Sequence, residues 1–266
     1  MQHFENKVVW ITGASSGIGE ALAYTFAKHK AKLILSARRA DELERVKQAC
    51  KLPDADVLLL PMDVSAYTQM DDHVQQALKH FGHIDVLANN AGMSHWSKLK
   101  DTSLDVVKRI MDVNFMGAVG LTHAVLPSML QRKQGQIIVV SSILGKMITP
   151  KQGVYNASKH ALMGYFDTLR TEVKGEGVKV LIVCPGFVRT NVAKNSLDKH
   201  GNPINKDNNL IANGIDPLVL SEDILSAVKA GKEEVILAGG KEKFAVLMKR
   251  FAPGLFSKFI SGQKIG

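Results

Sequence analysis

Short apolar runs alternate with longer amphipathic segments along most of the chain, and this alternation limits the folds that it can adopt. Seven runs, such as KVVWITG and AKLILSA near the N-terminus, each hold four to six consecutive apolar or β-branched residues. Continuous hydrophobicity of this kind is typical of strands that are covered on both faces. Repeated strand-helix alternation predicts right-handed crossovers and a parallel sheet. The segments of helical period lie at residues 17–30, 41–50, 67–81, 103–131, 155–174 and 221–230.

We therefore expect an α/β protein: a single-domain, Rossmann-like, doubly wound parallel sheet of about seven strands over residues 1–240. The 266 residues are enough for one large domain or two small ones, but no repeat, low-complexity segment or linker divides them. Residues 187–220 are rich in Asn and Gly and follow a predicted strand. They are expected to form a substrate loop at the carboxyl edge of the sheet.

Cysteine usage and the N-terminal sequence indicate a cytoplasmic protein. Cys50 and Cys184 are far apart, and Cys184 lies in an apolar run, so no disulfide framework is expected. No apolar stretch of signal-peptide length begins the chain, and no run approaches the roughly 18 consecutive apolar residues of a membrane span. The nearest histidine pair, His80 and His83, is typical of an exposed helix end, so no metal site is expected.

A glycine-rich turn, TGASSGIGE, follows the first predicted strand, and Gly13, Gly17 and Gly19 lie where it opens a helix. Such a turn lets the backbone approach a pyrophosphate, which then sits on the unpaired N–H groups of the helix N-terminus. The spacing is G-x-x-x-G-x-G and not the G-x-G-x-x-G of the standard dinucleotide fingerprint. A plain tight turn stays open as the alternative, although the strand-turn-helix context favours a nucleotide.

Arg38 and Arg39 follow the second predicted strand, where an NAD-binding protein places an acidic residue for the ribose 2′-hydroxyl. A guanidinium can instead pair with a 2′-phosphate in bidentate fashion. The sequence therefore favours NADP(H), with NAD(H) as the alternative. The competing interpretation is that both arginines are solvated and precede a helix with Asp41 as its N-cap.

Several polar residues lie where ligand-binding and catalytic groups are expected. Asp63 and Asn90 come at the ends of the third and fourth predicted strands, and Ser142 at the end of the fifth. Tyr155 and Lys159 are one helical turn apart, so they project from the same face of a helix. Such a pair alone is more often a packed Tyr with a solvated Lys. The glycine turn, the NNAG run, Ser142 and the mid-helix Asn114 together favour a catalytic role.

This combination of T-G-x-x-x-G-x-G, N-N-A-G, S-x12-Y-x-x-x-K and P-G motifs resembles the short-chain dehydrogenase/reductase (SDR) family, in its classical branch, over roughly residues 5–240. The resemblance implies that Tyr155 is the general acid/base and that Lys159 lowers the pKa of Tyr155 and bonds the nicotinamide ribose. It implies that Ser142 polarises the substrate oxygen, and that Asn114 holds a water in a proton relay to Lys159. The positions that it assigns to the cofactor, besides Tyr155 and Lys159, are Thr12, Gly13, Ser15, Ser16, Gly17, Ile18, Gly19, Arg38, Arg39, Asp63, Val64, Asn90, Ala91, Gly92, Pro185, Gly186, Val188 and Thr190.

The chain departs from the family pattern in its glycine turn, and the resemblance leaves the oligomeric state and the substrate open. Many NADP-using members carry a basic residue inside the glycine turn, where this chain has Ser15 and Ser16, so specificity would rest on Arg38 and Arg39. The apolar helix at residues 103–131 suits a partner helix, which fits the homodimer or homotetramer that the resemblance implies; an unusually buried monomeric helix is the alternative. The predicted pocket borders are mostly apolar, which indicates a lipophilic alcohol or carbonyl substrate. They include Met93, Trp96, Ile143, Leu144, Met147, Ile148, Phe187, Val192 and Leu197, with His95, Lys146 and Lys194 nearby.

The net charge of +9 is concentrated at the C-terminus, where residues 241–266 contain six basic residues and Glu242 as their acidic one. Aromatic and aliphatic residues alternate with these charges, as in an amphipathic helix interrupted at Pro253 and Gly254. Packing on its own domain or on another subunit is the first interpretation, and peripheral contact with an anionic membrane is the second. Nucleic acid is not expected, because the chain has no recognisable nucleic-acid-binding module.

We interpret the chain as an NADP(H)-dependent oxidoreductase that interconverts a lipophilic secondary alcohol and its carbonyl by hydride transfer. The alternative is a dinucleotide-sensing or scaffold protein that keeps the cofactor site without turnover. Retention of Asn114, Ser142, Tyr155 and Lys159 together argues for the enzyme, since a sensor does not need all four.

Overall fold

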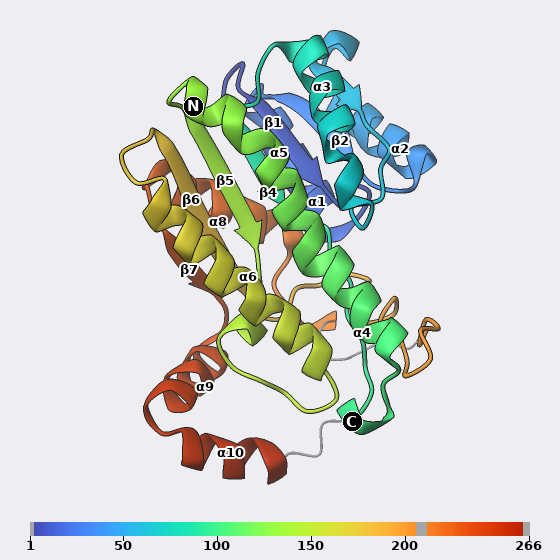
Figure 1. The fold of residues 1–266 in the computed structure, drawn as a ribbon, viewed down its shortest axis with the longest axis vertical. Coiled ribbons are helices and arrows are strands. Elements are labelled where there is room, and N and C mark those ends of the chain that lie inside the picture. Colours follow the sequence, from blue (N-terminus) through green and yellow to red (C-terminus); the bar gives the residue numbers. More distant parts are fainter. Residues whose placement is uncertain (1–2, 206–211, 263–266) are drawn as a thin grey trace.

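The computed structural model describes residues 3–205 and 212–262, and it confirms the predicted fold with one seven-stranded parallel sheet. The sheet order is β3-β2-β1-β4-β5-β6-β7 (Figure 1). β1 lies between β2 and β4, so the strand order reverses there, and ligands bind beyond the carboxyl ends of strands at such a point. The strands are β1 (Val8–Thr12), β2 (Lys32–Ser36), β3 (Val57–Leu59), β4 (Val86–Asn89), β5 (Gly135–Val140), β6 (Val178–Pro185) and β7 (Glu234–Leu237).

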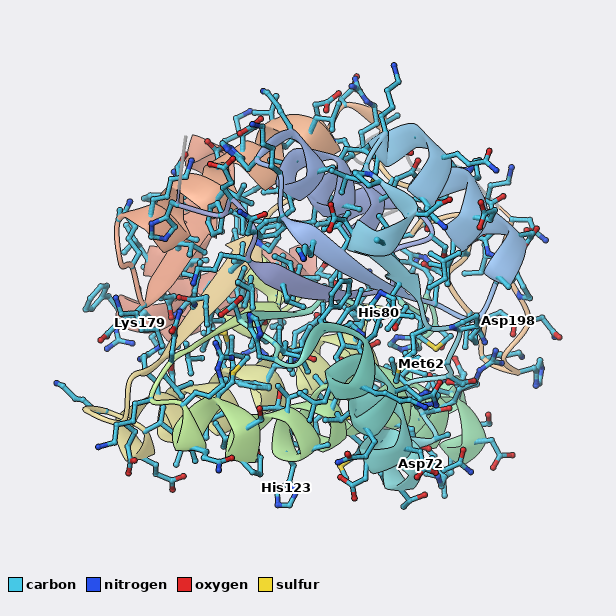
Figure 2. The ribbon with its side chains drawn as sticks, turned by 90° about the horizontal axis from the view of Figure 1, so that it is seen from above. Met62, Asp72, His80, His123, Lys179 and Asp198 are labelled. Atoms are coloured by element: carbon cyan, nitrogen blue, oxygen red, sulfur yellow. The ribbon has the colours of Figure 1, made fainter. Side chains whose placement is uncertain are left out.

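Helices cover both faces of the sheet, which lies between two helical layers in Figure 2. One layer contains α1 (Gly17–Lys28), α2 (Ala40–Cys50) and α8 (Pro217–Lys229); the other contains α3 (Met70–Phe81), α5 (Gly117–Gln131) and α6 (Gly153–Glu172). α4 (Leu104–Met111) runs into α5 through the π-helical segment η4 (Asp112–Met116). The short 3-10 turns are η1 (Asp54–Asp56), η2 (Tyr67–Gln69), η3 (Leu99–Asp101) and η5 (Ile143–Gly145).

The alternation of side chains along β1 shows why the sequence builds two cores. Val9 and Ile11 point toward the α1 layer, whereas Val8 and Trp10 point toward the α5 layer, and all four are at most 1% exposed. The Trp10 indole N–H donates to the Ser36 hydroxyl at 2.9 Å, so the buried ring leaves no polar atom unpaired. Strands with apolar residues on both faces form this sheet because each face must be covered.

Some predicted boundaries differ from the structure. Strands β3, β4 and β5 end at Leu59, Asn89 and Val140, so Asp63 and Ser142 lie in the loops that follow the strands. Asp41 is not an N-cap: α2 begins at Ala40 after Arg39, which places Asp41 in the first turn. A carboxylate there still favours the positive end of the helix dipole.

Residues 104–131 form a helical stretch that could cross a membrane by length and composition alone, with a mean hydropathy of 1.3 in its most apolar window. No run of consecutive apolar residues signalled it, because charged residues interrupt α4. Leu121, Val125 and Met129 of α5 are fully buried against the sheet and its neighbouring helices, and 39% of that window is buried.

The C-terminal tail forms two helices beyond the carboxyl ends of the strands, α9 (Gly240–Phe251) and α10 (Pro253–Gly262) (Figure 1). Pro253 begins α10 because a proline at the first helical position has no N–H to leave unpaired. Residues 206–211 of the predicted substrate loop and residues 263–266 of the tail, Lys264 included, lie outside the described residues.

Candidate active site

The glycine turn joins β1 to α1 in a conformation that leaves space for a ligand. Gly13 and Gly17 have φ angles of +65° and +59°, which L side chains rarely adopt. A Cβ at Gly19 would lie 2.2 Å from the Gly13 carbonyl oxygen. Ser16 precedes α1, and its side chain accepts no hydrogen bond from the first N–H groups of the helix. Unpaired N–H groups at a helix N-terminus suit a phosphate, so the turn fits the pyrophosphate of a dinucleotide.

Thr12 and Asn90 hold the glycine turn against the end of β4. The Thr12 hydroxyl accepts from the backbone N–H groups of Asn90 and Ala91 at 3.0 and 3.1 Å. The Asn90 amide donates to the Thr12 carbonyl at 2.9 Å and to that of Gly13 at 3.4 Å. The two predicted motifs are thus brought together, and the Asn90 amide N–H supports the turn. Val64 lies against Gly117 at the start of α5, further along the same edge.

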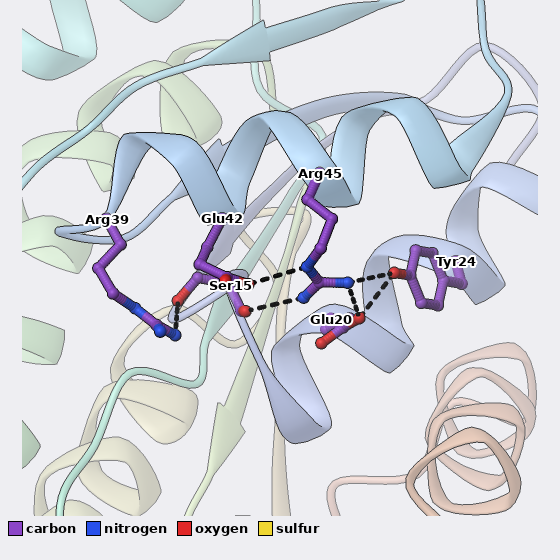
Figure 3. Close-up of polar contacts among 6 residues, drawn as sticks. All are labelled: Ser15, Glu20, Tyr24, Arg39, Glu42 and Arg45. Atoms are coloured by element: carbon purple, nitrogen blue, oxygen red, sulfur yellow. Dashed lines mark hydrogen bonds and ion pairs between the residues drawn. The ribbon is translucent and has the colours of Figure 1, made fainter.

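Arg39 lies beside the glycine turn, and its guanidinium donates to the Ser15 hydroxyl at 3.5 Å (Figure 3). Both residues line a cleft of about 650 Å³, which also reaches Thr190 and Arg189. The charge of Arg38 also influences Asp63. Partial burial raises the pKa of Asp63, but hydrogen bonds from Ser65 and the charges of Arg38 and Arg109 outweigh it and hold this pKa below its usual range.

Arg45 was not predicted, and it fixes the outer wall of the same cleft (Figure 3). Its guanidinium pairs with Glu20 at 2.7 Å and Glu42 at 2.8 Å, and donates to the Ser15 carbonyl at 3.4 Å. Burial and the neighbouring Glu20 raise the pKa of Tyr24 to about 12, so this phenol stays neutral. The helical spacing of Glu42 and Arg45 is enough to predict their ion pair. Nothing local in the sequence indicates the contact of Arg45 on α2 with Glu20 on α1.

Tyr155 and Lys159 lie on one face at the beginning of α6, as predicted. The Lys159 Nζ is 5.6 Å from the centre of the Tyr155 ring and donates to the Val140 carbonyl at 2.9 Å. Burial lowers the pKa of Lys159 to about 8. Burial also raises the pKa of Tyr155, although a hydrogen bond with Ser142 acts in the opposite direction. The three side chains therefore meet beyond the carboxyl ends of β5 and β6.

Asn114 lies in η4 and is 1% exposed. Its amide donates to the Met93 carbonyl at 2.9 Å and to the Ser158 hydroxyl at 3.0 Å, while its oxygen accepts from the Met93 N–H at 2.8 Å. A Cβ at Gly92 would lie 3.4 Å from the Asn114 oxygen and 3.7 Å from the Lys159 Nζ. Asn114 and Lys159 thus converge at Gly92, and the π-helical segment is a local distortion of a kind frequent at functional sites.

The Pro185–Thr190 segment closes the other side of the site. Gly186 N–H donates to the Leu237 carbonyl at 2.9 Å, and Val188 forms a bridge with Ile215. A Cβ at Gly17 would lie 3.0 Å from the Thr190 methyl group, so this segment reaches the glycine turn. Glu242 of α9, which the sequence did not indicate, accepts a hydrogen bond from the Phe187 N–H at 3.1 Å.

Only some of the residues predicted to border the substrate pocket line a cleft in the structure. His95 and Leu197 bridge the NNAG segment to the substrate loop, and both are buried. Neither ring nitrogen of His95 has a hydrogen-bond partner among the described residues. Burial lowers the pKa of His95 to about 4. Ile148 lines a second cleft, of about 540 Å³, beside the first turn of α6. Among the described residues no group of three or more His, Cys, Asp or Glu gathers as a metal site.

This geometry can move a proton at the carboxyl edge of the sheet. A phenol can donate to or accept from a substrate oxygen, a neighbouring hydroxyl can bond the same oxygen, and an ammonium near the phenol favours its ionised form. These are the elements of general acid/base chemistry next to the cleft at the glycine turn.

Residues 7–201 match the short chain dehydrogenase family. The chain is 39% identical to the Anopheles gambiae dehydrogenase/reductase SDR family protein 7-like, over 96% of this chain and 82% of that protein. It is 37% identical to Bos taurus dehydrogenase/reductase SDR family member 7B, over 98% and 82%. It is 49% identical to Homo sapiens dehydrogenase/reductase SDR family member 7, over 72% of this chain and 58% of that protein.

Two solved structures share the fold closely. A Burkholderia phymatum short chain dehydrogenase/reductase in complex with NAD has a TM-score of 0.86 and 26% identity, over 96% of both chains. An alcohol dehydrogenase from Thermococcus sibiricus, complexed with 5-hydroxy-NADP, has a TM-score of 0.75 and 27% identity, over 87% of this chain and 95% of that chain. The predicted resemblance is therefore confirmed.

Proposed function

The chain belongs to the short-chain dehydrogenase family and is an oxidoreductase that acts on CH–OH groups, and we propose that it interconverts a lipophilic secondary alcohol and its carbonyl with NADP(H). The observation that carries the proposal is that Lys159 lies near Asn114 at Gly92 and also beside the Tyr155 ring, while Ser142 is hydrogen-bonded to Tyr155. A nicotinamide dinucleotide, when bound, donates or accepts the hydride.

Residues of the chain transfer the proton to and from the substrate oxygen. In carbonyl reduction the Tyr155 hydroxyl donates a proton to the substrate oxygen, and the Ser142 hydroxyl donates a hydrogen bond to the same oxygen. The Lys159 ammonium stabilises the phenolate that remains. Asn114 is held in place by hydrogen bonds with Met93 and Ser158. In the proposal it holds a water that passes a proton to Lys159, from which the Tyr155 phenolate is reprotonated.

The pKa shifts favour the acid role of Tyr155 at neutral pH. Burial raises the pKa of Tyr155, so its phenol is protonated and ready to donate. Lys159, whose pKa is about 8, carries its charge below that pH and loses it above. Alcohol oxidation needs the phenolate. Because the pKa of Lys159 lies near 8 and that of Tyr155 is raised above its usual value of 10, a rising pH removes the Lys159 charge before it deprotonates Tyr155.

Arg39 supports NADP(H) over NAD(H). It stands beside Ser15 in the cleft at the glycine turn, and Ala37 occupies the strand-end region where an acidic residue would bind a ribose 2′-hydroxyl. A guanidinium there can bind a 2′-phosphate. The similar structures hold cofactors of both kinds, so the fold alone favours neither.

The substrate class, the assembly and the location complete the proposal. Ile148, an apolar border residue that lines the second cleft, suits a lipophilic substrate. The part of α5 that does not face the sheet, together with α6, is the proposed contact of a homodimer or homotetramer. We place the enzyme in the cytoplasm.

The proposal is tested by titrating the purified protein with NADPH and NADH and following nicotinamide fluorescence. Lipophilic ketones and alcohols are then screened for an absorbance change. We expect tighter binding of NADPH, and Arg39→Ala should weaken NADPH binding by at least about tenfold while leaving NADH binding nearly unchanged. Arg38→Ala, at the other arginine assigned to the 2′-phosphate, is measured in parallel. Arg250→Ala, at an exposed position of α9, is the matched control and should leave both affinities unchanged.

Two results would contradict the proposal. Preference for NADH would remove the assigned role of Arg39. Binding of either dinucleotide without turnover of any compound in the panel would favour the dinucleotide-sensing or scaffold protein instead.

A further inference from the structure

Helices α9 and α10 carry a stripe of exposed apolar side chains that no other described element covers. These side chains are between 48% and 76% exposed, and they make up half of the strongly exposed large apolar residues in the described part of the chain. They are Phe244, Leu247, Phe251, Leu255 and Phe259.

The stripe has helical spacing in both helices. Phe244, Leu247 and Phe251 lie at positions i, i+3 and i+7 of α9, so they share one face. Val246 and Phe256, in contrast, are buried at 8% and 1% exposure. The stripe is therefore distinct from the tail positions that are buried.

Basic residues flank the stripe. Lys243, Arg250 and Lys258 are exposed, and Lys241 extends the series at the start of α9. The acidic residue of the described tail, Glu242, accepts hydrogen bonds from the Phe187 and Gly239 N–H groups and is thus directed toward the body of the protein. Apolar residues rimmed by positive charge match an anionic lipid surface. Two copies of the same tail would bring like charges together, which disfavours a self-contact.

The position of the tail places this surface near the candidate active site. Glu242 ties the first turn of α9 to Phe187, which follows β6 at the carboxyl edge and is 41% exposed. Figure 1 shows α9 and α10 beyond the end of the sheet to which the β5 arrow points. A surface on which the tail lies would therefore be close to the mouth of the site.

We propose that the α9–α10 pair docks on an anionic membrane surface, with Phe244, Leu247 and Phe251 in the headgroup and acyl boundary and the basic residues on lipid headgroups. The supply of a lipophilic substrate directly from the bilayer rests on the function proposed above, whereas the docking itself does not.

The test is co-sedimentation of the full chain with vesicles of phosphatidylcholine alone and with added phosphatidylserine. We expect binding to the anionic vesicles that weakens at high salt. The triple substitution Phe244→Ser, Leu247→Ser and Phe251→Ser should lower the bound fraction by at least about tenfold. The matched control, Leu104→Ser with Val219→Ser, changes residues that are 81% and 56% exposed elsewhere and should bind as the unaltered chain does.

NADPH binding by the triple serine variant should be unchanged, which shows that the domain is folded and separates this test from the test of the enzyme activity. Lack of sedimentation of the unaltered chain, or equal sedimentation of that chain and the triple variant, would overturn the proposal. Light scattering that shows the triple variant losing a subunit contact would also overturn it, because the stripe would then be an interface between copies.

Discussion

The Glu242 carboxylate in the first turn of α9 accepts a hydrogen bond of 3.1 Å from the backbone N–H of Phe187, the second residue after β6. Its other oxygen accepts from the Gly239 N–H at 2.6 Å. Gly186 makes this approach feasible, because a Cβ there would lie 2.5 Å from the same carboxylate. One side chain thus joins the tail to the segment that we propose to contact the nicotinamide end of the cofactor.

Glu242→Ala is expected to raise the KM for NADPH several-fold and to lower the free energy of unfolding by about 1–2 kcal/mol, since two hydrogen bonds to a carboxylate are lost. Glu242→Gln keeps one acceptor oxygen and should have an intermediate effect. Steady-state kinetics and urea unfolding measure the two quantities.

The matched control for this prediction is Glu44→Ala on α2, because Glu44 is exposed and accepts only from the neighbouring Gln48 among the hydrogen bonds described. Both quantities should stay near their original values in this variant. A fall in stability of Glu242→Ala with unchanged kinetics would mean that Glu242 anchors the tail without positioning the Phe187 segment.

Tyr155→Phe removes the hydroxyl that we propose transfers the proton, while the ring remains in place. Turnover should fall by at least about 10²–10⁴-fold, and the dissociation constant of NADPH should change little. Tyr165→Phe, on the same helix and partly buried, is the matched control and should keep full turnover. Stopped-flow absorbance and fluorescence titration measure the two effects, and a Tyr155→Phe enzyme with normal turnover would refute the acid/base role.

Two glycine-to-alanine substitutions should act in opposite directions. At Gly19 the added Cβ would lie 2.2 Å from the Gly13 carbonyl oxygen and 2.5 Å from the Asn90 amide nitrogen, so the glycine turn has to move. Weaker NADPH binding and a lower unfolding temperature are expected. At Gly164, in the interior of α6, no described atom beyond the local helix backbone lies within 4 Å of the new Cβ, and alanine should stabilise the protein by up to about 1 kcal/mol. Thermal unfolding compares them, and an unaffected Gly19→Ala protein would argue against the tight turn.

The sequence predicted those parts of the fold and site that depend on local patterns. Seven continuous apolar runs became the seven strands, because a parallel sheet covered on both faces needs apolar residues at every position. Tyr155 and Lys159 could be paired because their spacing is one helical turn. The glycine turn could be recognised because positive φ angles and close backbone approach require glycine.

Contacts between distant elements could not be predicted in this way. The partners of Arg45 and Glu242 become visible only when α2 lies beside α1 and α9 lies beside the end of β6. The π-helical segment around Asn114 was also missed, because its irregular turn leaves the apolar period of residues 103–131 nearly unchanged. These features depend on the tertiary arrangement, which local spacing does not encode.

His95 should make the protein less stable in mild acid. Burial lowers the pKa of this imidazole from 6.5 to about 4, so between these values the unfolded chain binds a proton that the folded protein does not. Stability therefore falls as the pH falls from 6.5 toward 4, and this effect is absent above 6.5. Between pH 7 and pH 5 the loss attributable to His95 is about 2 kcal/mol.

His95→Phe removes the titrating group and keeps a ring at the buried position, so the drop in unfolding free energy between pH 7 and pH 5 should be smaller by about that amount. His123→Phe is the matched control, because His123 projects from the exposed surface of α5 (Figure 2), and it should keep the original pH dependence. Urea unfolding at both pH values measures the difference. If His95→Phe and the unaltered chain lose the same stability in acid, then His95 takes up its proton in the folded protein as readily as in the unfolded chain, and its environment between the NNAG segment and the substrate loop is polar rather than closed.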